Sequence, residues 1–171
     1  MWLIEAEPVV DERGSFRRHF CQEEYKKNRL EFNIVQSNIS ENPKKYTLRG
    51  FHYQIQPFEE NKTLTCLSGS FYDVIIDLRL GSDTFMKSMS VELVAGDNLT
   101  LFVPAGCANA YLTLEDSTVI LYYMSEFFAP KSYRGFRYND PSFSIDWPYK
   151  PEIISSKDKN FPDFDLNKIN K

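Results

Sequence analysis

The feature that most constrains the fold of this chain is a series of short β-prone segments separated by turn sequences. Runs rich in β-branched and aromatic residues alternate with Gly, Asn, Asp and Pro, and helical periodicity is nearly absent. Short strands at such regular intervals, with turn signals between them, are typical of β-sandwiches and barrels. We expect a hairpin of 63–67 and 70–79, then strands at about 87–94, 99–103, 109–114 and 117–124.

The first third and the tail of the chain differ from this regular middle. The first third predicts strands at 2–10, 15–20, 32–40 and 47–54, with a turn at 11–14 and a polar helix at 21–29. Five prolines between 130 and 162 interrupt any long element in the tail. The tail is therefore predicted to lie as loops over the barrel, within a single domain spanning 1–171.

Composition excludes several classes of protein. The chain has 171 residues, 42% hydrophobic residues and a net charge of −4, which fits one globular domain and gives no bulk attraction to nucleic acid. The three cysteines are widely spaced without a CxxC pair, so neither a disulfide framework nor a zinc site is indicated. The N-terminus lacks the pattern of a signal peptide, and no apolar run is long enough for a membrane span. These features predict a reducing, cytoplasmic location.

One stretch, Thr47-Leu48-Arg49-Gly50-Phe51-His52-Tyr53-Gln54, holds one of the only two histidines. Period-2 alternation places Arg49 and His52 on opposite faces of a strand, unless a bulge or a twist intervenes. A histidine among Phe and Tyr is either a satisfied core residue or a base tuned near neutral pH. The local sequence leaves both interpretations open.

The sequence lacks the residues needed for metal catalysis, for a serine nucleophile of the GxSxG type and for a phosphate-binding loop. Two histidines cannot supply the three-histidine set with which small cupin barrels usually hold a metal. The sequence has no GxSxG motif and no glycine-rich phosphate loop. Acid–base chemistry remains, with His52 as a candidate base, Lys62 as a cation that could stabilise an anion, and tyrosines as candidate acids.

The 47–54 stretch closely resembles the LRGxHxQ motif of the dTDP-4-dehydrorhamnose 3,5-epimerase family. Further similar segments follow in the same order as in the family, and together they cover nearly the whole chain. The resemblance implies a cupin-like jelly-roll barrel with one or two short helices, a loop-rich C-terminal segment, and the active site inside the barrel. It also implies a homodimer, no cofactor and no metal. The other matching segments are 11–14, 36–38, 73–79, 104–111 and 156–158.

The resemblance also implies roles for individual residues. The substrate would be a nucleotide-diphosphate 4-keto sugar, whose C3 and C5 protons are acidic because they lie next to the ketone. His52 would be the base, oriented by Asp158; Lys62 would face the enolate oxygen, and Tyr122 would be the acid on the far face. Register against Asn109 favours Tyr122 over Tyr123. The substrate-binding residues implied are Arg13, Arg18, Gln36, Asn38, Arg49, Asn109 and Lys157.

Two positions depart from the pattern of the family. Asn109 stands where the family has a second histidine, and Arg18 stands where an acidic residue is frequent. Because an amide cannot carry charge or shuttle a proton, we expect an altered substrate pocket. We therefore expect a substrate other than dTDP-4-keto-6-deoxyglucose, such as a GDP-linked heptose of a surface polysaccharide, with inversion at C3, C5 or both.

Two alternatives remain open at this point. A 3,4-ketoisomerase on the same barrel would use the same base but would move the carbonyl group. A non-catalytic sugar-nucleotide-binding barrel would need no acid and base on opposite faces, so the combination of His52, Lys62, Tyr122 and Asp158 argues against it.

Overall fold

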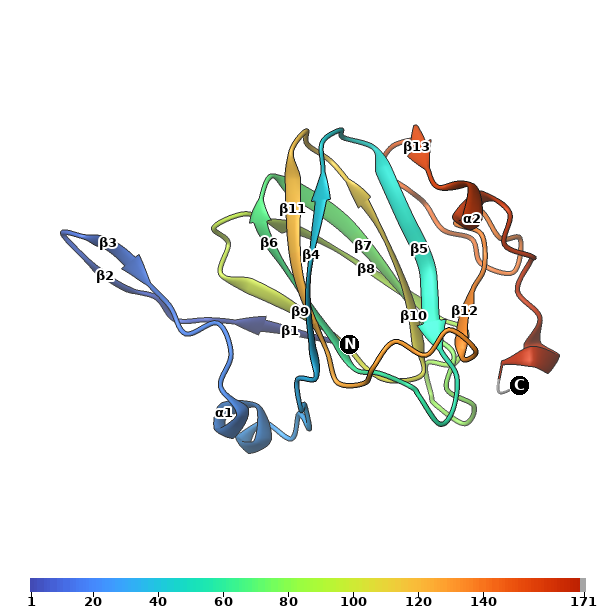
Figure 1. The fold of residues 1–171 in the computed structure, drawn as a ribbon, viewed down its shortest axis with the longest axis horizontal. Helices are drawn as coiled ribbons and strands as arrows, with labels where there is room; N and C mark the ends of the chain where they lie inside the picture. The colour runs from blue at the N-terminus through green and yellow to red at the C-terminus, as the bar shows by residue number, and fades with distance from the viewer. Residues whose placement is uncertain (170–171) are drawn as a thin grey trace.

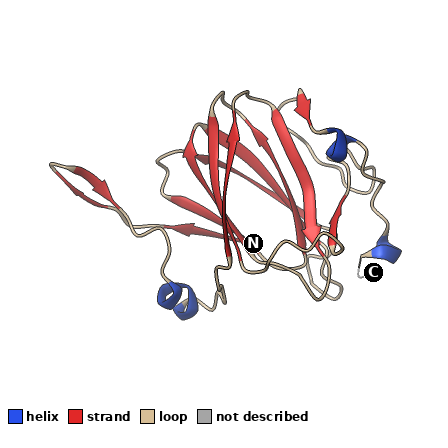
Figure 2. Ribbon diagram, in the orientation of Figure 1, coloured by secondary structure: helices blue, strands red, loops and turns tan. Residues whose placement is uncertain are grey.

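Two antiparallel sheets face each other in the computed structural model, which describes residues 1–169 (Figure 1). The first sheet has the order β1-β9-β6-β11-β4, and the second has the order β12-β5-β10-β7-β8, with β13 paired in parallel to β5. Strands dominate and the helices are short (Figure 2). The strands are β1 (Trp2–Glu5), β2 (Val9–Asp11), β3 (Gly14–Phe16), β4 (Gln36–Asn42), β5 (Thr47–Gln54), β6 (Lys62–Ser68), β7 (Ser70–Asp77), β8 (Ser88–Val94), β9 (Leu99–Val103), β10 (Cys107–Thr113), β11 (Thr118–Met124), β12 (Tyr133–Gly135) and β13 (Ile153–Ile154); the helices are α1 (Gln22–Lys27), α2 (Ser156–Lys159) and the 3-10 turn η1 (Leu166–Lys168).

The space between the two sheets is filled by alternate residues of facing strands. Leu64 of β6, Phe71 and Ile75 of β7, Leu101 of β9 and Ile120 of β11 all belong to this buried cluster. The period-2 pattern of each strand therefore sends one set of side chains inward. Lys62 of β6 and Tyr122 of β11 share this inward parity and belong to the site described below.

The C-terminal segment covers the outer face of the second sheet. Phe51 of β5 is fully buried and stacks on Phe136, with ring centroids 4.8 Å apart. Phe143 packs on Phe136 at 5.1 Å and extends this second core toward the tail. Strand β5 is therefore covered on both faces, and six of its eight residues are buried.

The first 20 residues depart from their predicted strands. The expected strand at 2–10 is interrupted between β1 and β2, and the strand expected at 15–20 ends with β3 at Phe16. The hairpin of β2 and β3, called the arm below, projects away from the barrel (Figure 1). The strand expected at 32–40 begins only at Gln36, because Leu30 and Phe32 instead pack with helix α1 in a third apolar cluster.

The expected turn at 11–14, the helix and the middle strands are confirmed. The architecture is a cupin-like jelly-roll barrel, as the family resemblance implied. No helix in the described part of the chain is long and apolar enough to cross a membrane.

Candidate active site

A cavity of about 420 Å³ opens between the two sheets. His52, Arg49 and Gln54 reach it from β5 on one wall, and Lys62 and Tyr122 reach it from β6 and β11 on the other. Its lining combines apolar and polar side chains, as in most small-molecule sites. The remaining lining residues are Ile39, Ser40, Glu41, Glu60, Leu64, Asn109, Tyr111, Met124, Phe128 and Tyr133.

A β-bulge in β5 brings Arg49 and His52 into the same cavity. Across β10, Asn109 lies opposite His52 while Tyr111 lies opposite Arg49, so β5 carries one extra residue between the two pairs. Simple alternation therefore fails here, and the expectation of opposite faces holds only for an unbulged strand. Gly50 occupies the bulge with a φ of +117°, and a Cβ there would lie 2.6 Å from Ala110. Glycine is thus required at this position.

His52 is paired with Asp158, as expected. Nε2 of His52 lies 2.8 Å from Oδ1 of Asp158, while Oδ2 of Asp158 accepts a hydrogen bond from the backbone N–H of Gly50 at 3.3 Å. The hydroxyl of Ser155 caps helix α2 by accepting from the Asp158 N–H. Because Nε2–H of His52 donates its proton to the hydrogen bond with Asp158, the other ring nitrogen, Nδ1, keeps a free lone pair and can act as a base.

Burial and the carboxylate act on the imidazole in opposite directions. Burial lowers the pKa of His52, and the hydrogen bond and charge of Asp158 oppose that change. Burial would raise the pKa of Asp158, but the hydrogen bond and charge of His52 hold it below its ordinary value. The histidine is therefore neutral near pH 7, as a general base must be, and its partner carries the negative charge.

Lys62 lies beside the histidine with its side chain only 11% exposed. Its ammonium donates to the backbone carbonyl of His52 and to Oδ1 of Asn109, each at 3.3 Å. It also forms an ion pair with Oε1 of Glu60 at 3.0 Å. A buried ammonium held in this way can stabilise negative charge that develops in the cavity.

Asn109 connects Lys62 to a fully buried carboxyl group. Nδ2 of Asn109 donates to Oδ2 of Asp73 at 3.1 Å, and Asp73 is 0% exposed. Burial raises the pKa of Asp73 to about 8, although Asn109 and the charge of Lys62 act against it. Asp73 is therefore a neutral acid at pH 7, and the neutral amide beside it is compatible with that state.

Tyr122 lies on the wall opposite His52. It pairs with Leu64 of β6 and Asn38 of β4, so it belongs to the first sheet, whereas His52 belongs to the second. Burial raises the pKa of Tyr122, although the charge of Arg49 opposes this. The phenol thus keeps its proton at neutral pH. Tyr123 points the other way, into the cluster around helix α1.

Two further cavity residues did not follow from the sequence. Glu60 lies in the loop before β6, where the sequence shows only a charged run. Tyr133 of β12 lies next to the imidazole of His52, with ring centroids 5.3 Å apart. Burial, together with the charges of Asp158 and Glu60, raises the pKa of Tyr133. Tyr133 lies in a Pro-rich segment late in the chain, where the sequence pattern does not indicate a site residue.

The predicted binding residues fall into two groups. Arg49 and Asn109 line the cavity, and Arg49 donates from Nε to Oδ1 of Asn42 at 3.0 Å. Asn38 does not line the cavity, but it pairs with Tyr122 across the two strands and so lies on the same face of the sheet. Gln36 is engaged with the backbone N–H of Phe128 at 2.6 Å, and exposed Lys157 lies over the Tyr133 ring at 3.9 Å.

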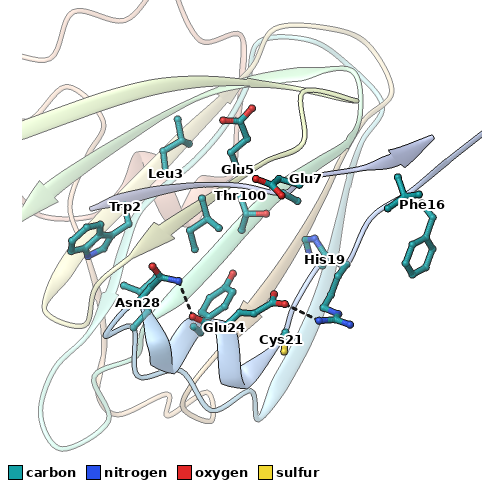
Figure 3. Close-up of a pocket in the computed structure, with 16 residues that line it drawn as sticks. Trp2, Leu3, Glu5, Glu7, Phe16, His19, Cys21, Glu24, Asn28 and Thr100 are labelled. Carbon is teal, nitrogen blue, oxygen red and sulfur yellow. Dashed lines mark hydrogen bonds and ion pairs between the residues drawn. The ribbon is translucent and has the colours of Figure 1, made fainter.

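Arg13 and Arg18 do not reach this cavity. Arg13 lies in the turn of the arm, where it forms an ion pair with Asp11. Arg18 lines a second groove of about 670 Å³ between β1 and helix α1, where it forms an ion pair with Glu24 at 2.7 Å. Figure 3 shows this groove, with Glu24 on helix α1. The expected change of pocket charge by Arg18 is therefore not found at the His52 cavity of its own chain.

The site thus contains a neutral imidazole backed by a carboxylate, a phenol on the facing wall, and a buried ammonium between them. This set can remove a proton next to a carbonyl group, stabilise the enolate, and return a proton from the other side. This arrangement on a jelly-roll barrel is that of an isomerase that acts by acid–base chemistry on a carbon next to a carbonyl group.

Comparison with known proteins gives the same class and specifies it. The model of the dTDP-4-dehydrorhamnose 3,5-epimerase family matches residues 1–165, and the chain belongs to this family. A relative from Sinorhizobium fredii, a dTDP-4-dehydrorhamnose 3,5-epimerase, is 35% identical over 94% of this chain and 83% of its own length.

Solved structures of the same family have the same fold as this chain. The dTDP-4-dehydrorhamnose 3,5-epimerase of Elizabethkingia anophelis superposes with a TM-score of 0.92 at 34% identity, covering 99% of this chain and 92% of the other. The dTDP-6-deoxy-D-glucose-3,5-epimerase of Legionella pneumophila, in complex with dTDP-4-keto-L-rhamnose, gives 0.88 at 32% identity, covering 96% and 87%.

Proposed function

We propose that this enzyme inverts C3, C5 or both in a nucleotide-diphosphate 4-keto sugar, with His52 as base and Tyr122 as acid. The observation that carries the proposal is the placement of the His52–Asp158 pair and of Tyr122 on opposing walls of one cavity. A 4-keto sugar between two such walls can lose its α-proton to one side, which gives a planar enolate, and regain a proton from the other side. This sequence of steps inverts the carbon.

Each residue has a definite part in the proposed reaction. Nδ1 of His52 takes the proton from the carbon next to the ketone, and Asp158 stabilises the imidazolium that forms. The electrons move onto the ketone oxygen, and the ammonium of Lys62 stabilises the resulting enolate. Tyr122 then donates its phenolic proton to the opposite face of the carbon, and exchange with solvent restores both groups.

The nucleotide and its phosphates would contact the remaining predicted residues. Arg49 has the geometry to bind an anion or sugar oxygens at the cavity wall, because guanidinium groups offer several donors in one plane. The cavity residues Phe128, Tyr122 and Tyr133 are contacted by or paired with three further predicted residues, which would contact the nucleoside or the phosphates: Gln36, Asn38 and Lys157. The relatives named above act on dTDP sugars, and the change to Asn109 supports testing other nucleotides as well.

A homodimer would bring Arg13 to a substrate. Val10 and Phe16 of the arm are 71% and 73% exposed, and the arm projects away from its own barrel (Figure 1). Apolar side chains on a projecting hairpin gain stability when a second copy covers them. The family role expected for Arg13 would then be performed in the cavity of the partner subunit. Light scattering of the purified protein measures the oligomeric state directly.

The cellular setting is also part of the proposal. All three cysteines are free, which fits a reducing cytoplasm. The product would enter the synthesis of a surface polysaccharide, as the family resemblance implies.

One experiment tests the reaction and separates the alternatives. The protein is incubated in deuterated water with dTDP-, CDP- and GDP-linked 4-keto sugars, and the C3 and C5 protons are followed by NMR. Exchange with inverted configuration supports the epimerase. Migration of the carbonyl group would identify a 3,4-ketoisomerase, and tight binding of every sugar without exchange would identify a non-catalytic binding protein.

A further inference from the structure

Glu60 is a buried carboxylate in the cavity wall that the proposed mechanism does not use. Its side chain is 3% exposed, and Oε1 forms the ion pair with Lys62 at 3.0 Å. Oε2 is buried and has no hydrogen-bond partner among the residues that the structure describes. A buried carboxylate oxygen without a donor is costly, so its retention in a ligand cavity calls for an explanation.

Of the two buried carboxyl groups near Lys62, Glu60 is the one that contacts the ammonium directly. Asp73 approaches Lys62 only through Asn109, and burial, opposed by the Asn109 hydrogen bond and the charge of Lys62, raises its pKa to about 8. Asp73 is therefore mainly protonated at neutral pH, and Glu60 is the carboxylate in direct contact with the ammonium, at 3.0 Å. The pair of Glu60 and Lys62 offers one anionic acceptor and one cationic donor at a single place in the cavity.

The donors of Lys62 are fully used before any substrate binds. An ammonium has three N–H groups. In this structure they are met by the backbone carbonyl of His52, Oδ1 of Asn109 and Oε1 of Glu60. A substrate oxygen that accepts from Lys62 must therefore replace one of these acceptors. Replacement of Glu60 would leave both of its oxygens without a donor, at a substantial cost in free energy.

A ligand can avoid this cost if it carries a donor next to the oxygen that Lys62 binds. An α-hydroxy ketone does so, because its carbonyl oxygen accepts from an ammonium while the adjacent hydroxyl donates to a carboxylate. In a 4-keto sugar, the hydroxyl on C3 stands in this relation to the ketone on C4. Charge-assisted hydrogen bonds of this kind are stronger than neutral ones.

We propose that Glu60 is a specificity-determining residue, which accepts a hydrogen bond from the hydroxyl adjacent to the substrate ketone while Lys62 binds the ketone oxygen. This inference rests on the proposed function and adds a selection rule to it. The enzyme accepts 4-keto sugars that keep the C3 hydroxyl and rejects sugars that lack it.

The test takes the 4-keto sugar with a C3 hydroxyl that wild type exchanges fastest among the dTDP-, CDP- and GDP-linked sugars above, and compares it with its 3-deoxy analogue. Both sugars keep the C5 proton, so deuterium incorporation at C5 gives kcat/KM for each of them. Wild type should prefer the hydroxylated sugar by at least ~10²-fold, because a site built around a hydrogen bond strongly rejects the analogue that lacks the hydroxyl. Glu60→Met removes both acceptor oxygens and should reduce this ratio to within ~10-fold of unity.

Two further variants complete the design. Glu60→Gln keeps the shape and one acceptor oxygen without the charge, and should lower the ratio at least ~10-fold relative to wild type. Glu59→Met changes the neighbouring carboxylate, which does not line the cavity, and should leave the wild-type ratio unchanged. A purely structural role for Glu60 would lower the rates on both sugars equally and leave the ratio intact.

The outcomes separate this inference from the function on which it rests. Equal wild-type rates on the two sugars, or an unchanged ratio in Glu60→Met and Glu60→Gln, would overturn the role of Glu60 and leave the epimerase standing. A wild-type protein that exchanges none of the sugars in the panel would overturn the proposed function, and the inference with it.

Discussion

Nε2 of His52 lies 2.8 Å from Oδ1 of Asp158, although 106 residues separate the two in the chain. Strand β13 makes this contact possible, because it pairs in parallel with the start of β5 and places helix α2 next to the bulge. The same carboxylate accepts from the N–H of Gly50. One side chain thus fixes both the imidazole and the irregular backbone that presents it.

Replacing Asp158 should change the pH dependence of the reaction. The hydrogen bond and charge of Asp158 raise the pKa of His52 against the larger effect of burial. Asp158→Asn removes the charge, so the pKa of His52 should fall and the acid limb of the exchange rate should move to lower pH. The maximal rate should fall as well, because the imidazolium loses its counter-charge. Rates of C5 exchange from pH 4 to 9 measure this shift.

The control for that profile is Asp163→Asn in the same C-terminal segment. Asp163 forms an ion pair with Arg137 and is half exposed, away from the cavity. The pH dependence of C5 exchange in Asp163→Asn should match that of wild type. An acid limb that stays in place in Asp158→Asn would show that the carboxylate does not set the basicity of His52.

Tyr122→Phe should separate proton exchange from inversion. His52 can still remove a proton and return a deuteron to the same face, so exchange should survive better than net inversion. Tyr123→Phe is the matched control, because Tyr123 packs on the outer side near helix α1. NMR of the product gives both quantities at once. Equal loss of exchange and inversion, or uncoupling by Tyr123→Phe instead, would show that another group is the acid.

Lys62→Met should lower turnover by roughly 10²-fold or more, as expected for loss of an oxyanion-stabilising donor. The single variant leaves the Glu60 carboxylate buried without its cation, so Lys62→Met with Glu60→Gln keeps the cavity neutral. Turnover should be low in both. If only the Michaelis constant rises, Lys62 binds substrate without stabilising the enolate.

The buried carboxyl of Asp73 predicts an unusual dependence of stability on pH. Its pKa is raised to about 8 in the folded protein by burial, against an ordinary value near 3.8. The folded state therefore holds this proton more tightly, and its contribution to the free energy of unfolding declines as pH rises from about 4 to 8. Asp73→Asn should remove that decline and stabilise the protein at pH 8 by more than ~1 kcal/mol. Thermal unfolding across this range is the measurement.

Asp77 provides the opposite case. Burial would raise the pKa of Asp77, but hydrogen bonds from Arg79, Thr84 and Ser82 hold it below its ordinary value. It therefore stabilises the fold at neutral pH, and this contribution is lost as pH falls through the acid range. Asp77→Asn should destabilise the protein at pH 7. If Asp73→Asn destabilised it equally at pH 8, Asp73 would be ionised in the folded state.

The sequence predicted the barrel because the middle strands obey the period-2 rule and end at clear turn residues. It missed the bulge in β5, since nothing in the local pattern shows that Gly50 must avoid Ala110 on the next strand. Arg49 and His52 were thus expected on opposite faces. The first strands were misjudged because exposed apolar residues of the arm, such as Phe16, look like core residues in sequence.

The site was predicted in part, and mainly through family resemblance. His52, Lys62 and Tyr122 meet at one cavity as expected, and Asp158 contacts His52. Glu60 was missed because a buried loop carboxylate is indistinguishable in sequence from a solvated one. Tyr133 was missed because tertiary packing of the tail alone places it. Roles in catalysis stay predictions for all of these residues.

The most direct test is deuterium incorporation at C3 and C5 of a nucleotide-linked 4-keto sugar by wild type and His52→Ala. Wild type should incorporate deuterium, and the variant should lose ~10² to 10⁴ in rate while binding nucleotide within roughly tenfold of wild type. Incorporation by His52→Ala at the wild-type rate would contradict the assignment of His52 as the base.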